Sequence, residues 1–127
     1  MFALNACGDC HGVHAATAQA FGIQEATLGV LLADVAAAPV DERMKPLLAL
    51  AGKLTVTPAK VTPADAQAVL TAGWPEQALH DAVAVCAPFN MMNRLVEVVG
   101  ITAGDDYFKL AAGRLAGGAY AGLRELL

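Results

Sequence analysis

Apolar residues recur every three or four positions along most of this chain, and this spacing predicts a protein built from helices. The longest periodic run extends from Pro75 to Gly100 and would form a helix about 37 Å long. Further helices are expected over residues 10–21, 24–35, 41–54, 62–73 and 105–126. No segment alternates with a period of two between hairpin turns, so we expect a single all-α domain over residues 1–127.

Glycine and proline residues predict where these helices begin and end. Gly22 and Gly100 follow the last periodic positions of two helices, where a left-handed residue commonly ends a helix. The sequence Thr62-Pro63-Ala64-Asp65 combines a capping hydroxyl, a proline at the first helical position and an acid in the first turn. Asp41 is expected to cap the helix over 41–54. Glycines of the last helix are expected to allow close helix packing; they are Gly113, Gly117, Gly118 and Gly122.

Composition adds expectations about partners and location. Hydrophobic residues make up 57% of the chain and charged residues only 16%, which favours self-association. The net charge of −4, with no cluster of Lys and Arg, gives no basic surface for nucleic acid or an anionic membrane. There is neither an uninterrupted run of about 18 apolar residues nor an export signal at the N-terminus, so a cytoplasmic protein without a membrane span is expected.

The candidate chemistry lies in the stretch Cys7-Gly8-Asp9-Cys10-His11-Gly12-Val13-His14. On a helix that starts near Cys10, the side chains of Cys10 and His14 share one face, and Cys7 lies at its N-terminal end. The positive end of a helix lowers a thiol pKa and an imidazole can take the proton, so at least one of the two cysteines is a candidate thiolate. Cys86 stands alone in an apolar run and is expected to be a small buried hydrophobe.

Four interpretations of this motif compete: simple packing, zinc binding, haem attachment and thiol redox chemistry. Zinc would use Cys7, Cys10 and His14 and would need a partner chain, because no second ligand pair follows. Haem attachment matches Cys-x-x-Cys-His with His11 as the axial ligand, but the missing export signal argues against it. Redox catalysis would use one thiolate to attack a peroxide or disulfide and the other cysteine to resolve the product.

The motif Cys7-x-x-Cys10-x-x-x-His14, opening a helix in an all-α chain, resembles the alkylhydroperoxidase D and carboxymuconolactone decarboxylase superfamily. The segment 84–95, with the sequence AVCAPFNMMNRL, resembles a helix of its uncharacterised peroxidase-related branch. The segment Leu50-Ala51-Gly52-Lys53-Leu54, followed by a Thr-Pro-rich link and Asp65, also fits that branch. The likeness covers most of the chain up to Ile101.

This resemblance implies an antioxidant peroxidase or disulfide oxidoreductase that has no bound cofactor and forms trimers or hexamers, with a dimer as an alternative. Cys10 would attack the peroxide, Cys7 would resolve the intermediate, and His14 would act as the base. The electron donor would be a thiol or a lipoyl-type domain. From the residues alone, Cys7 is equally eligible as the attacking thiol because it lies nearer the helix end.

The chain departs from the family in one respect. The family's proton relay includes a glutamate about a dozen residues before the first cysteine, whereas here no acid precedes Asp9 and the family's N-terminal helix is missing. Three explanations are open. The relay is incomplete and the activity is weak; Asp9, His11 or a residue of another subunit replaces the glutamate; or the natural protein starts further upstream. Asn90 is a candidate pocket residue, although packing is its simpler role. A helical assembly protein without catalysis is the remaining alternative.

Overall fold

The computed structural model describes residues 1–118, and it consists of helices and the turns that join them, with no strand in that range. The elements in chain order are α1 (Gly8–Ala20), α2 (Glu25–Ala33), α3 (Met44–Val56), the short 3₁₀ helix η1 (Pro58–Lys60), α4 (Pro63–Thr71), α5 (Glu76–Val99) and α6 (Asp105–Gly118). The predicted all-α class is confirmed, and each predicted helix has a counterpart. The predicted helical residues after Gly118 lie outside the described residues.

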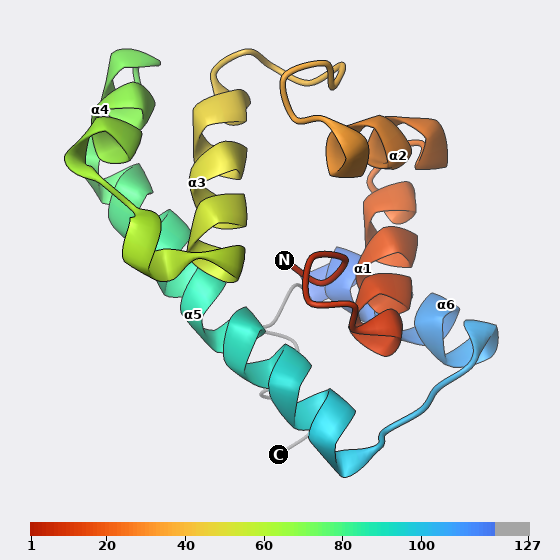
Figure 1. Cartoon of the computed structure of the whole chain (residues 1–127). Helices are drawn as coiled ribbons and strands as arrows, with labels where there is room; N and C mark the ends of the chain where they lie inside the picture. Colours follow the sequence, from red (N-terminus) through yellow and green to blue (C-terminus); the bar gives the residue numbers. More distant parts are fainter. Residues whose placement is uncertain (119–127) are drawn as a thin grey trace.

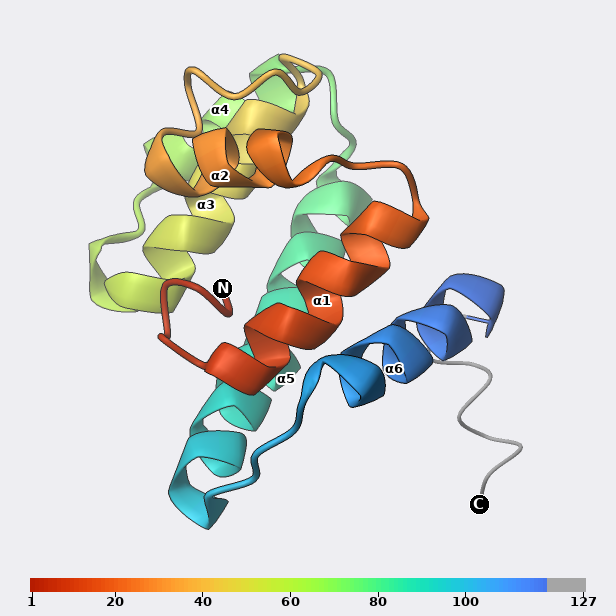
Figure 2. The ribbon, with the colours of Figure 1, turned by 90° about the vertical axis from the view of Figure 1, so that its right-hand side faces the viewer.

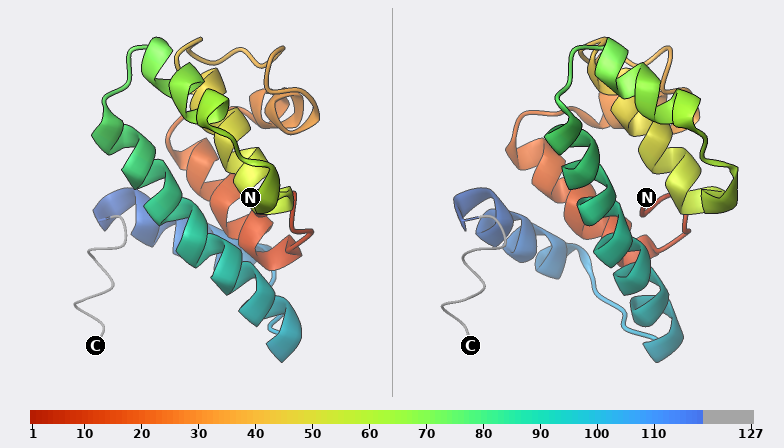
Figure 3. Two further views of the ribbon diagram at one scale, coloured as in Figure 1. Left: turned by 60° about the vertical axis from the view of Figure 1, so that its left-hand side comes forward. Right: turned by 90° about the vertical axis from the view of Figure 1, so that its left-hand side faces the viewer.

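Helix α5 runs the length of the molecule and connects its two parts (Figure 1). α3 and α4 pack against each other and against α5, beside its N-terminal half (Figure 3). α1 contacts α5, α2 and α6, and its contact with α6 is the most extensive between any two helices described (Figure 2). The N-terminal turn lies between α1 and the α3–α5 pair (Figure 1). The start of α1, which carries the cysteine motif, is therefore enclosed by the first turn of the chain and by α5.

The helix ends follow the local signals in most places. Gly22 and Gly100 both have positive φ angles, of 83° and 67°, as predicted for helix-ending residues. At the start of α4, an Asp65 side-chain oxygen accepts hydrogen bonds from the backbone N–H and the hydroxyl of Thr62, at 2.7 and 2.8 Å. The predicted cap at Asp41 is wrong, because the N-cap of α3 is Arg43. The Asp41 carboxylate instead accepts a hydrogen bond from the Arg43 N–H, which closes a turn before the helix begins.

Two side chains hold α4 in place, one from α3 and one from the N-cap residue of α3. Lys53 donates hydrogen bonds to both carboxylate oxygens of Asp65, at 2.8 and 2.7 Å. This contact, together with the two hydrogen bonds from Thr62, lowers the pKa of Asp65 to about 2. Arg43 donates to the Gly73 carbonyl at the end of α4 and lies over the ring of Trp74. Both ends of α4 are thus fixed to α3.

The fully buried core is small for a chain so rich in apolar residues. Its apolar members are Cys7, Ala38, Leu50, Val69, Cys86 and Ala112. Cys86 is buried as predicted. Among the described residues, α5 is the one helix long and apolar enough to cross a membrane by length and composition, and a single such helix is weak evidence for a membrane span. Self-association through exposed apolar surface stays a prediction.

Among the described glycines, the tightest contact with another helix is at Gly12 of α1 and not at the glycines of α6. A Cβ atom added at Gly12 would lie 2.6 and 2.7 Å from the Cζ and Cδ2 atoms of Phe108 on α6. A Cβ added at Gly113, Gly117 or Gly118 meets no heavy atom of the described residues within 4 Å. The prediction that the α6 glycines allow close packing is therefore wrong for these three, and Gly122 lies outside the described residues.

Candidate functional site

Cys7 lies at the junction between the N-terminal turn and α1. The chain folds back before the helix, with the Cys7 N–H donating to the Phe2 carbonyl at 3.1 Å. Ala6 has a φ of 55°, in the left-handed region that few residues other than glycine adopt. This conformation turns the chain into α1, where Cys7 is the N-cap and its side chain is completely buried. The predicted position of Cys7 at the helix start is confirmed.

The two motif cysteines face each other as free thiols. The Cys7 side chain forms a hydrogen bond with Cys10, which is only half-buried. Burial, together with hydrogen bonds to Cys10 and Glu97, raises the pKa of Cys7 to about 12. The sequence predicts that the positive end of the helix lowers the thiol pKa. At Cys7, the loss of solvation raises the pKa and is the larger effect. Cys7 is held as a thiol, and Cys10 is the more accessible of the two sulfurs.

Cys10 and His14 both line one cavity of about 630 Å³, which we call the thiol cavity. Most of its other lining residues are apolar: Phe2, Val13, Phe89, Met92, Val96, Ile101, Ala103 and Tyr107. The side chains come from the N-terminal turn, α1, α5, the α5–α6 loop and α6. The predicted placement of Cys10 and His14 on one helix face is confirmed by their shared cavity.

Aromatic rings hold the imidazole of His14. Its ring stacks on Phe2 with a centroid distance of 4.1 Å and meets Phe89 edge-on at 5.2 Å. Burial lowers the pKa of His14 below its ordinary value of 6.5. The imidazole is therefore neutral at pH 7 and can accept a proton.

The lowered pKa of His14 predicts a loss of stability in acid. The folded protein binds a proton at His14 less readily than the unfolded chain does. The resulting stability is fully present above about pH 6.5 and is lost as the pH falls through the lowered pKa of His14. In urea unfolding between pH 7.5 and pH 4.5, His14→Phe should keep an aromatic ring in place and show a smaller acid loss than the wild type. His80→Gln, at an exposed position on α5, should show the full wild-type loss. Equal losses in all three proteins would contradict the assignment.

Asp9 supports the cavity through the backbone. Its side-chain oxygen accepts a hydrogen bond from the Ala103 N–H at 2.6 Å, which ties the α5–α6 loop to the first turn of α1. Residues 101–103 of this loop form one wall of the thiol cavity. Asp9 thus holds a wall of the cavity in position, and this contact gives it a structural role.

Two other sequence candidates lie outside the thiol cavity. His11 faces α2 and lines a separate pocket of about 230 Å³ that also includes Glu25. Asn90 accepts a hydrogen bond from Asn5 at 2.8 Å and donates to the Cys86 carbonyl at 2.9 Å. The packing role preferred for Asn90 agrees with these contacts, and neither residue lines the cavity that contains Cys10.

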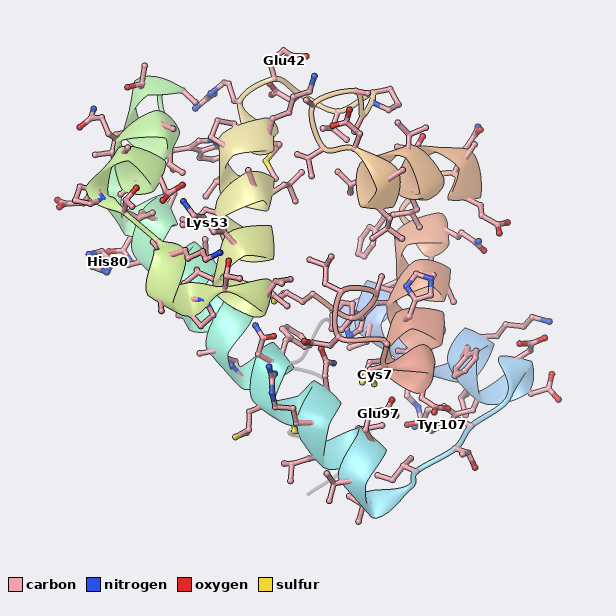
Figure 4. All side chains as sticks on the ribbon, in the orientation of Figure 1. Cys7, Glu42, Lys53, His80, Glu97 and Tyr107 are labelled. Atoms are coloured by element: carbon pink, nitrogen blue, oxygen red, sulfur yellow. The ribbon has the colours of Figure 1, made fainter. Side chains whose placement is uncertain are left out.

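Sequence reasoning missed Glu97 as a residue of this site. It lies on the C-terminal part of α5, and its carboxylate forms a hydrogen bond with the Cys7 side chain. Figure 4 shows the two labelled side chains facing each other between α1 and α5. The only signal in the sequence is a single acid near the end of an apolar helix, one turn after Asn93. A distant part of the chain thus brings a carboxylate to the side chain of Cys7.

Metal binding receives no support from this geometry. Within residues 1–118, no three side chains of His, Cys, Asp or Glu are arranged to hold a metal ion, and this includes the proposed zinc ligands Cys7, Cys10 and His14. The site is instead a thiol pair with a neutral imidazole on one side and a carboxylate on the other. No protein-family model, curated protein or solved structure matches the chain, so a functional assignment depends on the geometry of this site.

Proposed function

We propose that this protein is a thiol-dependent peroxidase in which Cys10 attacks the peroxide, Cys7 resolves the product and His14 accepts the first proton. One observation carries the proposal: Cys10 and His14 line the same apolar cavity, while Cys7 is buried behind Cys10 and hydrogen-bonded to it. A half-buried thiol that shares an apolar cavity with a neutral base is suited to nucleophilic attack. Burial and the raised pKa of Cys7 disfavour its attack on the peroxide, which leaves Cys10 as the first nucleophile.

In the first step, neutral His14 takes the proton of the Cys10 thiol, and the thiolate attacks one oxygen of a hydroperoxide. A sulfur–oxygen bond forms and the oxygen–oxygen bond breaks. The leaving alkoxide takes the proton from His14 and departs as an alcohol. Cys10 is oxidised by two electrons to a sulfenic acid, and the peroxide is reduced by the same two electrons.

In the second step, Cys7 attacks the oxidised sulfur of Cys10, and a disulfide forms as hydroxide leaves. Glu97 is placed to take the Cys7 proton and pass it to the leaving hydroxide, which departs as water. An external dithiol then reduces the disulfide by two exchange steps and is itself oxidised to a disulfide. This cycle uses no bound cofactor.

The size and lining of the thiol cavity favour a hydroperoxide that carries an apolar organic group. Its volume of about 630 Å³ lies within the range typical of small-molecule sites. Apolar side chains from α5 and the N-terminal turn would remove such a group from water. We therefore expect cumene hydroperoxide to be a better substrate than hydrogen peroxide.

The proposal is tested by turnover of cumene hydroperoxide with dithiothreitol. Cys10→Ser should lower the rate at least about a hundredfold, because the attacking sulfur is lost. Cys86→Ala is the matched control, since this buried thiol does not line the thiol cavity. Equal rates for wild type and Cys10→Ser would remove the catalytic proposal and favour a helical assembly protein.

A further inference from the structure

A further pocket lies at Glu97, outside the thiol cavity. It has a volume of about 310 Å³ and is lined by Asn5, Asn93, Arg94, Glu97 and Val98. We call it the polar pocket, because four of its five lining residues have polar or charged side chains. It is formed by the N-terminal turn and one face of α5, and none of its residues lines the thiol cavity.

The polar pocket contains an unsatisfied hydrogen-bond donor. Asn93 is only 1% exposed, and its side-chain oxygen accepts a hydrogen bond from Asn5 at 2.8 Å. Its Nδ2 atom is buried and has no acceptor among the described residues. A buried amide without an acceptor is costly, so an oxygen atom of a bound ligand or water that accepts from Nδ2 would be stabilised here.

The polar pocket also brings together two opposite charges that do not neutralise each other. Arg94 and Glu97 are three positions apart on α5, so they lie on the same side of the helix. Arg94 donates to the Asn90 carbonyl at 2.6 Å, and Glu97 contacts the Cys7 thiol. Neither side chain forms an ion pair with any residue between Met1 and Gly118. Both side chains therefore lack an opposite charge among the described residues, although each has a hydrogen-bond partner.

We propose that the polar pocket binds a small zwitterion of the amino-acid class. The ligand carboxylate would accept hydrogen bonds from Arg94 and from the Asn93 amide, and its ammonium group would pair with Glu97. A simple anion would be repelled by Glu97, and a simple cation by Arg94, so neither matches the polar pocket as well. Glu97 also contacts Cys7, so ligand binding is measured directly and without peroxide turnover, and a failure of the thiol chemistry would leave this inference standing.

The test uses L-alanine together with propionate and ethylamine, which each lack one of its two charged groups. Binding is followed by chemical shifts of backbone and side-chain amides in ¹⁵N-labelled protein. We expect L-alanine to shift the Asn93 side-chain signals with a Kd of about 1 mM, because a ligand with so few atoms gains limited affinity. Propionate and ethylamine should bind at least about tenfold more weakly. Equal affinity for propionate, or no shift with L-alanine, would overturn the proposal.

Charge-removing variants test the two contacts separately. Arg94→Gln and Glu97→Gln should each weaken L-alanine binding at least about tenfold, whereas Arg94→Lys, which keeps the charge, should bind more tightly than Arg94→Gln. Lys109→Gln, at an exposed position on α6, is the control and should bind as the wild type does. Wild-type affinity in both Arg94→Gln and Glu97→Gln would place the ligand elsewhere and overturn the assignment.

Discussion

Replacing Cys7 with serine is expected to change the product of peroxide treatment from a disulfide to a sulfenic acid on Cys10. In the wild type, the two side chains are hydrogen-bonded, so Cys7 is in position to attack the oxidised Cys10. Serine cannot form the disulfide, and the intermediate should accumulate at one equivalent per chain. We expect nearly complete conversion with one equivalent of cumene hydroperoxide and no added thiol.

Mass spectrometry of the intact protein separates the two products, because the wild type should lose two hydrogen atoms while Cys7→Ser gains one oxygen atom. A 1,3-diketone that reacts with sulfenic acids should then label Cys10 in the variant. Cys86→Ala should behave as the wild type does, since Cys86 lies outside the thiol pair. If Cys10→Ser gains the oxygen instead, Cys7 is the attacking thiol and the roles proposed for the two cysteines are reversed.

The relative placement of Cys10 and His14 could be predicted from the sequence, because helix geometry determines it. Cys10 and His14 are four positions apart in a helical segment, so their shared face follows from 3.6 residues per turn. Glu97 could not be found in this way. Its approach to Cys7 depends on how α5 docks against α1, and no local pattern encodes that docking.

The pKa of Cys7 also could not be predicted from the sequence. Its position at the N-terminal end of α1 was predictable, and a helix end by itself lowers a thiol pKa. Complete burial of the side chain has the opposite effect and is larger, so the pKa rises to about 12. Burial at this position is created by packing of the N-terminal turn, which five residues of sequence could not specify.

The fold shows which sequence signals are reliable and which are not. Helix ends at Gly22 and Gly100 and the cap at Thr62 were predicted, because each depends on a single residue and its neighbours. The packing role assigned to the α6 glycines was not correct. A glycine lowers helix propensity wherever it occurs, but whether another helix lies close to it depends on the tertiary arrangement. The close approach is at Gly12, within the cysteine motif itself.

Gly12→Ala is therefore expected to destabilise the protein, although alanine is the better helix former. The new Cβ would overlap the ring of Phe108, so the ring must leave its position and α6 must shift on α1. Overpacking of this kind costs about 1–3 kcal/mol, which exceeds the gain of about 1 kcal/mol from helix propensity. Urea unfolding monitored by circular dichroism should show a lower midpoint for the variant.

Two comparisons separate this clash from a general effect of alanine in α1. Gly8→Ala should leave the unfolding free energy unchanged or raise it by up to about 1 kcal/mol, because a Cβ at Gly8 meets no atom within 4 Å. In a Phe108→Ala background, Gly12→Ala should be neutral or stabilising, since the ring that it displaces is absent. A destabilisation that persists without the Phe108 ring would show that the glycine is needed for another reason. Loss of the α1–α6 contact should also open the thiol cavity, because Tyr107 of its wall directly precedes Phe108.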